Sequence, residues 1–595
     1  MRLADYVWTF LAERGAQDVF LVTGGNAMHL DDALGLEIRL RIICVHHEQT
    51  AAMAAEGYAR ANGDPGVLCV TSGPGAINAL GGLYGAFVDS LPVICIAGQS
   101  KRELLRTSRD PEHVVGLRQL GVQEADAVAM AQPVTKYAAT VAEPFMIRYE
   151  MEKAWYLATS GRPGPAFLDI PLDVQAAEID PEILPGYTPQ PFKIRSMGPR
   201  CAAVAARLRL AKRPLLLGGE GVREGKAVKE FQQLAERLGI PVVTAWMPDL
   251  YPPDQCHYAG RVGSLGTRAG NFALQNADFI LAIGSRLSVP QVSFNWEQFA
   301  PRGYVVSVNI DSAELAKPIM VVDETVRAEP QLFLETLLSE WGNDTTTSAG
   351  WGEWLDWCRA RVARYPEVTD AMRVSSPSGI HPYWFVEELF NQLENDAFVA
   401  CGNALAACVP FQAAPLRLGQ RLTSNASAGA MGHDLPSAIG SAVARKGGRV
   451  ICLAGDGSLM MNLQELQTLV YCRLPIGIFV MNNGGYLSIR TTQKNFFGRY
   501  IGESPENGVS FPDFCAVALA FGLPVFRLEG EGYKTVLAEA LATDGPWVCD
   551  VRLDPDRGFE PCLSSKILPD GRMVSAPLDD MYPFLTEAER ASNRL

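Results

Sequence analysis

Two motifs predict the local fold, Gly455-Asp456-Gly457-Ser458 and Asn482-Asn483-Gly484-Gly485-Tyr486. The first follows the apolar run Val450–Ala454, the second follows Ile476–Met481, and the helical stretch Leu463–Cys472 lies between them. This order predicts a right-handed βαβ unit, in which both strands end at the same edge of one parallel sheet. Open α/β sheets bind their ligands at that edge.

Asp456 and Asn483 are the side chains of these motifs that suit a metal ion. Carboxylate and amide oxygens are hard ligands of the kind that Mg²⁺ prefers, and phosphates and water complete its octahedral shell. The glycines let the backbone approach a ligand closely. Either turn alone is ordinary loop chemistry. Because the two follow neighbouring strands, together they predict a site for Mg²⁺ and a phosphate-bearing ligand.

The composition describes an acidic globular protein of several domains. The chain has 595 residues, of which 48% are hydrophobic and 20% charged, with a net charge of −14. A domain has roughly 150 residues, so three or four domains are expected. Nucleic-acid binding depends on clustered Lys and Arg, and therefore a nucleic-acid partner is not expected.

A cytoplasmic location is also expected. No stretch reaches the roughly 20 consecutive apolar residues of a membrane span, and Leu3, Val7, Phe10 and Leu11 mark an amphipathic helix where a signal peptide would stand. The 13 cysteines form no C-x-x-C pair, so the sequence predicts neither a zinc site nor a disulfide framework. Free thiols fit a reducing compartment.

Two connectors divide the chain into thirds. Residues 176–199 are rich in proline, and residues 343–380 contain NDTTTSAG and SSPSG. Within each third, short apolar runs alternate with helical stretches, which is the pattern of βαβ units. We therefore predict an α/β protein with three doubly wound parallel-sheet domains. They span residues 1–180, 195–345 and 375–555, and a C-terminal tail spans 556–595.

The two motifs resemble the thiamine-diphosphate signature of the decarboxylase and acetohydroxyacid synthase superfamily, and the resemblance covers nearly the whole chain. It implies that Asp456, Asn483 and the backbone carbonyl of Gly485 bind Mg²⁺. It also implies that Met431, in Ser427-Ala428-Gly429-Ala430-Met431-Gly432, wedges the cofactor into a bent conformation, although a core methionine is the alternative. The other cofactor contacts implied are Gly75, Gly402, Asn403, Gly455, Gly457 and Ser458.

Glu48 matches the activating acid of this superfamily. It follows the apolar strand Arg41–Val45 and precedes the Ala-rich helix Gln49–Arg60. From position alone, the favoured role is to complement the dipole of that helix. The resemblance implies that its carboxyl group binds the aminopyrimidine ring and activates the cofactor, which requires an apolar site that raises the pKa.

The resemblance further implies a substrate channel and a subunit interface. The residues that would line the channel are Gly25, Gln99, Val122, Gln123 and Lys136. Glu48 and Asp456 lie in different domains, and in this family they meet across two subunits. A homodimer or homotetramer is therefore implied.

In the middle third, three turns follow apolar strands and resemble the FAD-contacting turns of acetohydroxyacid synthases. They contain Gly219, Gly284-Ser285-Arg286 and Asp311. FAD is therefore implied, and it would be non-redox because carboligation is redox-neutral. An empty domain or bound ADP are alternatives, since a glycine turn after a strand is a weak dinucleotide fingerprint.

The sequence departs from ordinary acetolactate synthases at two places. Val122 stands where those enzymes have Phe, and Tyr486–Gln493 contains no Trp where they usually have one. Together with the tail, these departures look more like the thiamine flavoenzymes of yersiniose (branched-chain sugar) biosynthesis. This resemblance implies decarboxylation of pyruvate and transfer of the two-carbon unit to a ketone acceptor, a nucleotide-linked keto-deoxysugar, to form a tertiary alcohol. Acetolactate synthase, an FAD-linked pyruvate oxidase and a non-catalytic nucleotide- or thiamine-binding protein are the alternatives.

Overall fold

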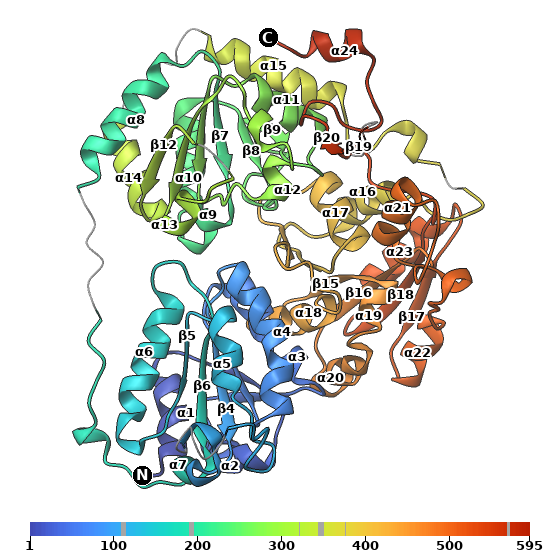
Figure 1. Cartoon of the computed structure of the whole chain (residues 1–595). Helices are drawn as coiled ribbons and strands as arrows, with labels where there is room; N and C mark the ends of the chain where they lie inside the picture. The colour runs from blue at the N-terminus through green and yellow to red at the C-terminus, as the bar shows by residue number, and fades with distance from the viewer. Residues whose placement is uncertain are drawn as a thin grey trace.

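The structure, a computed structural model, describes residues 1–108, 115–189, 196–319, 322–342, 350–374, 376–567, 570 and 572–595. It contains three parallel sheets of six strands each, flanked by helices (Figure 1). The predicted fold class is therefore confirmed. The predicted domain boundaries at 195, 345 and 375 lie outside the described residues, as do parts of both connectors.

The first sheet has the order β2-β1-β3-β4-β6-β5, and all its pairs are parallel. Side chains alternate between its faces, so Val19 and Leu21 pack on one side and Phe20 on the other. The strands are β1 Asp18–Leu21, β2 Arg41–Cys44, β3 Gly66–Val70, β4 Val93–Gln99, β5 Tyr137–Thr140 and β6 Ala166–Pro171. The helices are α1 Leu3–Glu13, α2 Met28–Leu36, α3 Glu48–Asn62, α4 Pro74–Val88, α5 Ala127–Ala131, α6 Ile147–Thr159 and α7 Leu172–Gln175.

The central sheet has the order β12-β11-β10-β7-β8-β9. Its strands are β7 Pro214–Gly218, β8 Val242–Thr244, β9 Tyr258–Arg261, β10 Phe279–Ile283, β11 Tyr304–Asn309 and β12 Glu324–Arg327. Its helices are α8 Gly198–Leu210, α9 Glu220–Glu224, α10 Val228–Leu238, α11 Arg268–Asn276, α12 Val289–Val292, α13 Ser312–Leu315, α14 Pro330–Trp341 and α15 Trp351–Arg364. Helices cover both faces of this sheet, so β7 and β10 are buried along their whole length. Their continuous apolar sequence suits this position.

The third sheet has the order β14-β13-β15-β16-β18-β17, which repeats the topology of the first sheet. Its strands are β13 Phe398–Cys401, β14 Arg421–Ser424, β15 Val450–Gly455, β16 Ile476–Asn482, β17 Val525–Leu528 and β18 Trp547–Arg552. Its helices are α16 Pro382–Gln392, α17 Leu405–Ala413, α18 Asp434–Ala444, α19 Asp456–Leu459, α20 Leu466–Cys472, α21 Leu487–Phe496, α22 Phe514–Ala520 and α23 Tyr533–Ala542. β15 and β16 are parallel neighbours, as the two motifs predict.

Helices α3 and α18 join the first and third domains (Figure 1). Small residues allow the approach: a Cβ atom at Gly440 would overlap the carbonyl oxygen of Ala54, and one at Gly57 would overlap that of Ser437. Residues of both helices, among them Ala55 and Ile439, belong to one hydrophobic core. The Ala-rich composition of α3 is therefore explained by burial between two domains.

We expect Gly440→Ala to destabilise the protein by about 3 kcal/mol, because the added methyl group would push two packed helices apart. Gly352 is a matched control, since it lies in α15 and a Cβ there meets nothing within 4 Å. Gly352→Ala should stabilise by up to about 1 kcal/mol. Denaturant unfolding of both variants measures the difference, and equal midpoints would contradict this account of the domain contact.

The C-terminal segment packs against the central domain. It forms the antiparallel pair β19 Ser565–Ile567 and β20 Met573–Ser575 and ends in α24 Glu587–Ser592. The amide of Leu563 donates to the carbonyl of Ser264 at 2.9 Å, and Asn276 Nδ2 donates to the carbonyl of Asn593 at 2.8 Å.

In the described part of the chain, no helix combines the length and apolar character needed to cross a membrane.

Candidate active site

The two motifs of the third domain meet at one point of the sheet edge. Strand order reverses between β13 and β15, which is the position where open α/β sheets bind ligands. The amide of Gly485 donates to Asp456 Oδ2 at 3.0 Å, and the amide of Gly457 donates to Oδ1 at 2.7 Å. Burial raises the pKa of Asp456 to about 6 against the effect of these amides. The predicted metal residues are therefore brought together.

The donor set fits a Mg²⁺ ion held beside a diphosphate. Asp456 and Asn483 are only 3% and 5% exposed. Asn483 Nδ2 is buried with no hydrogen-bond partner among the described residues, so the amide is free to orient toward a ligand. A Cβ at Gly457 would overlap the ring of Tyr486, and one at Gly485, where φ is +156°, would overlap the carbonyl of Glu503. These two positions require glycine.

Gly75 lies in α4 of the first domain, and the other residues predicted to contact thiamine diphosphate gather around the same edge of the third sheet. The amide of Gly432 donates to Ser458 Oγ at 2.7 Å, which ties the loop carrying Met431 to α19. Asn403 Nδ2 donates to the carbonyl of Gly429 at 3.3 Å. The structure therefore places the turn after β13, the loop before α18 and the turn after β15 side by side.

Asp434 was missed by the sequence analysis. It is fully buried, a Cβ at Gly402 would lie 2.6 Å from its Oδ2, and this oxygen has no hydrogen-bond partner among the described residues. Burial raises its pKa. An acid in the first turn of a helix is a common dipole partner, so its position in the sequence carries no signal of a site.

Glu48 is the first residue of α3 and lies half-buried on the first domain. Asn78 Nδ2 donates to its Oε2 at 3.0 Å, and a Cβ at Gly75 would lie 3.2 Å from Oε1. Its own domain therefore supplies a polar partner and leaves part of the carboxyl group open. The apolar enclosure predicted from the sequence is not formed by these neighbours.

Gln99 points into the protein. It is 3% exposed, its Nε2 donates to Asp169 Oδ2 at 2.7 Å and to the carbonyl of Ala125 at 2.9 Å, and its Oε1 accepts from the amide of Ser100. Lys136 is held within the first domain, where its Nζ donates to the carbonyl of Ser160 at 2.7 Å. Gln99 instead holds the loop that contains Val122 and Gln123.

This loop is strained and well anchored. Gln123 has a positive φ of 58°, and its carbonyl would be overlapped by a Cβ at Gly73. Such conformations in a non-glycine residue persist where the surroundings enforce them. The carbonyl of Val122 accepts from Ser100 Oγ at 2.9 Å and from Asn26 Nδ2 at 3.2 Å, next to Gly25. The Val122 side chain is 79% exposed.

The buried Asp169 beneath Gln99 makes stability depend on pH. Burial raises its pKa to about 7, so the folded state favours the protonated form. The stability it contributes is complete below the ordinary carboxyl pKa and is lost as pH rises through 7. We expect a loss of about 1 kcal/mol between pH 6 and pH 8. Asp169→Asn, whose amide oxygen can still accept from Gln99, should remove this loss in denaturant titrations at both pH values; an unchanged pH dependence would contradict it.

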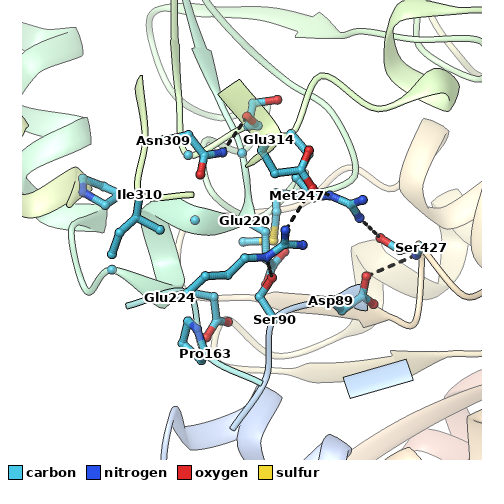
Figure 2. Close-up of a pocket in the computed structure, with 18 of the residues that line it drawn as sticks. Asp89, Ser90, Pro163, Glu220, Glu224, Met247, Asn309, Ile310, Glu314 and Ser427 are labelled. Carbon is cyan, nitrogen blue, oxygen red and sulfur yellow. Dashed lines mark hydrogen bonds and ion pairs between the residues drawn. The ribbon is translucent and has the colours of Figure 1, made fainter. Parts of the chain in front are cut away.

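A cavity of about 630 Å³ lies where the three domains meet (Figure 2). Counted along the chain, the central sheet has the order 3-2-1-4-5-6 of dinucleotide-binding sheets, with β7 and β10 at the reversal point. Gly219 and Gly284, which follow these strands, line the cavity. The amide of Gly221 donates to the carbonyl of Gly284 at 2.9 Å. The size fits a cofactor.

Arg286 connects this cavity to all three domains. Its guanidinium lies 2.7 Å from Glu314 in the central domain and donates to the carbonyl of Val88 in the first and to Ser427 Oγ in the third. Ser285 lines the cavity as well. Asp311 instead caps α13 and forms a 2.9 Å ion pair with Arg162.

Comparison with known proteins agrees with this arrangement. The models of the N-terminal, central and C-terminal domains of thiamine pyrophosphate (diphosphate) enzymes match residues 1–135, 201–337 and 401–551. The chain is 31% identical to the probable chloroplastic acetolactate synthase 2 of Oryza sativa subsp. japonica, covering 94% of this chain and 84% of that protein. It is 32% identical to the acetolactate synthase large subunit of Corynebacterium glutamicum, covering 93% and 87%. The chain therefore belongs to the thiamine pyrophosphate enzyme family, as an acetolactate synthase-like enzyme.

Proposed function

We propose that this enzyme decarboxylates pyruvate and transfers the two-carbon unit to a ketone acceptor, forming a tertiary alcohol. The proposed acceptor is a nucleotide-linked keto-deoxysugar, as in the thiamine flavoenzymes of yersiniose biosynthesis. Val122 carries the proposal, because a small, 79% exposed side chain on the anchored loop leaves room that a phenylalanine would fill. A bulky acceptor needs that room, whereas a second pyruvate does not.

The residues of the chain would divide the work between cofactor binding and activation. Thiamine diphosphate, when bound, supplies a sink for the electrons released by decarboxylation. Asp456, Asn483 and the carbonyl of Gly485 would hold Mg²⁺ on the diphosphate, and Met431 would support the bent cofactor. Glu48 would share a proton with the ring nitrogen of the aminopyrimidine. FAD would occupy the cavity between the domains without taking part in redox chemistry.

We further propose a homodimer or homotetramer in the cytoplasm. Glu48 is left partly open by its own domain, and the same domain carries exposed apolar side chains: Met28, Ile77 and Tyr84. A second copy that covered them would complete an apolar enclosure for Glu48. All 13 cysteines are free thiols in the structure, which supports a reducing compartment.

Product analysis by mass spectrometry tests the proposal. The enzyme, loaded with thiamine diphosphate, Mg²⁺ and FAD, is incubated with pyruvate, with and without cyclohexane-1,2-dione or a CDP-linked 4-keto sugar. We expect a tertiary alcohol at the expense of acetolactate. Acetolactate alone, unaffected by the ketone, would make the enzyme an acetolactate synthase, the second candidate, which the similarity to those synthases favours. Anaerobic bleaching of the flavin by pyruvate would indicate an oxidase.

Val122→Phe should shift the products toward acetolactate. The added ring would occupy acceptor space, and we expect the ratio of tertiary alcohol to acetolactate to fall about tenfold or more. Val115→Phe is the control, since Val115 is 84% exposed and adds the same ring elsewhere. An unchanged product ratio in Val122→Phe would show that this position does not select the acceptor.

A further inference from the structure

Two glutamates stand in the glycine turn that follows β7. Gly219-Glu220-Gly221-Val222-Arg223-Glu224 matches the dinucleotide fingerprint G-x-G-x-x-G except at its last position, where Glu224 replaces glycine. Both Glu220 and Glu224 line the cavity between the domains (Figure 2). An acidic pair at this position is unfavourable for the diphosphate that such a turn ordinarily receives.

Neither carboxyl group has a hydrogen bond or ion pair with another part of the chain that the structure describes. The neighbouring arginines are engaged elsewhere. Arg60 pairs with Glu56 at 2.6 Å and with Asp89, while Arg223 and Arg421 pair with Asp249 at 3.1 and 2.7 Å. Glu220 and Glu224 are therefore left as hydrogen-bonding groups directed at the cavity.

Burying a carboxylate without a hydrogen-bond partner costs desolvation free energy. Burial raises the pKa of Glu220 to about 7 and that of Glu224 to about 8, even though Arg60 and Arg223 act in the opposite direction. Hydrogen-bond donors on a ligand in the cavity would offset this cost. Uncharged hydroxyl groups are suitable donors, because they bring no negative charge toward the acids.

Four cationic side chains line the cavity, those of Arg60, Arg162, Lys226 and Arg286. Arg286 follows β10, and Arg162 comes from the first domain. Both contact Glu314, at 2.7 and 3.0 Å. Although both guanidinium groups are already paired with Glu314, their positive charge still favours an anionic part of a ligand near them. The two carboxyl groups of the turn after β7, which have no partner among the described residues, favour a part of the ligand that carries donors. A dinucleotide has both, since its diphosphate is flanked by hydroxyl-bearing chains.

We propose that Glu220 and Glu224 bind the hydroxyl-bearing part of the dinucleotide in this cavity, and that the diphosphate lies on the side of Arg162 and Arg286. The inference rests on the proposed occupancy of the cavity by FAD. Hydroxyls of this kind occur on the ribose of the ADP half and on the ribityl chain of the flavin half. The turn after β7 would then select the ligand by hydrogen bonds rather than by the phosphate contacts of an ordinary glycine turn.

Ligand titrations of the flavin-free full chain test this. FAD, ADP and FMN are titrated by calorimetry into the wild type, Glu220→Gln, Glu224→Gln and Glu236→Gln. Glu236 is the matched control, because it lies in the same domain, on α10, but is exposed and does not line the cavity. We expect the Kd for FAD to rise about tenfold or more in Glu220→Gln and Glu224→Gln, because ligand hydroxyls favour the ionised carboxylate, in which both oxygens accept, whereas an amide has a single accepting oxygen. The Kd should stay unchanged in Glu236→Gln. Parallel losses for ADP would identify the ribose, and losses for FMN the ribityl chain.

The outcomes separate this inference from the proposed function. Unchanged or tighter FAD binding by both Gln variants would overturn the role of the two acids while leaving FAD in the cavity. A correctly folded wild type that binds none of the three ligands would overturn the flavin occupancy, and the inference with it. Thermal unfolding of each variant verifies folding. If a Gln variant is unfolded, Glu→Asp at the same position, which keeps the charge but shortens the reach, must weaken FAD binding for the inference to stand.

Discussion

Replacing Glu48 with glutamine is expected to lower kcat by about 100- to 10,000-fold, the range of a lost general acid or base. Glutamine has nearly the same shape and can still accept from Asn78 Nδ2, which lies 3.0 Å from Glu48 Oε2. It cannot share a proton with the aminopyrimidine ring. The fold and the affinity for Mg²⁺ should therefore persist. Pyruvate consumption at saturating cofactor measures kcat, and thermal unfolding measures the fold.

Glu13→Gln is the control for this experiment, because Glu13 is exposed at the end of α1. It should retain wild-type activity. If Glu48→Gln also retained wild-type activity, the role proposed for this acid would be wrong. A protein that merely binds thiamine or nucleotides predicts that result.

Asp456→Asn is expected to weaken Mg²⁺ binding in the presence of thiamine diphosphate by about 100-fold or more, because a charged ligand becomes neutral. The stability of the metal-free protein should change little, because two effects oppose each other. Burial raises the pKa of Asp456 to about 6, so the neutral amide avoids the cost of ionisation at pH 8. The amide has one accepting oxygen, however, so it gives up one of the hydrogen bonds from Gly457 and Gly485. Mg²⁺ titrations followed by calorimetry and thermal unfolding of the metal-free protein measure the two effects.

The two readouts separate a metal ligand from a structural residue. A purely structural Asp456 would give a large fall in Tm without metal and an unchanged Mg²⁺ affinity of the folded protein, whereas a metal ligand gives weaker Mg²⁺ binding at a Tm close to that of the wild type. Asp544→Asn is the control, since Asp544 is fully exposed. Wild-type Mg²⁺ affinity in Asp456→Asn would place the metal elsewhere.

Much of the fold was predictable because parallel strands are buried on both faces and appear as apolar runs. β3, β4, β7 and β10 are such strands, and every residue in them is buried. The edge strands β5 and β12 were not predicted. β5 is only half-buried throughout and β12 is partly exposed, so neither has a continuous apolar run.

The site was predictable where its residues share one supersecondary unit. Asp456 and Asn483 follow adjacent strands, and the edge they share follows from parallel pairing alone. The inward direction of Gln99 was not predictable, because it depends on Asp169 and Ala125, which are distant in sequence. The same holds for Asp434, whose surroundings come from Gly402 and the turn after β15.

The three α/β units and the metal-binding motif could be predicted from the sequence, since strand periodicity, turn glycines and ligand spacing are local properties of the chain. Which polar groups find hydrogen-bond partners depends instead on the folded arrangement. Among the described residues, Glu220 and Glu224 have no partner, because Arg60 pairs with Glu56 and Asp89, and Arg223 and Arg421 pair with Asp249. Hydrogen bonding and desolvation depend on neighbours in space, and those neighbours are set by the packing of the domains rather than by order along the chain.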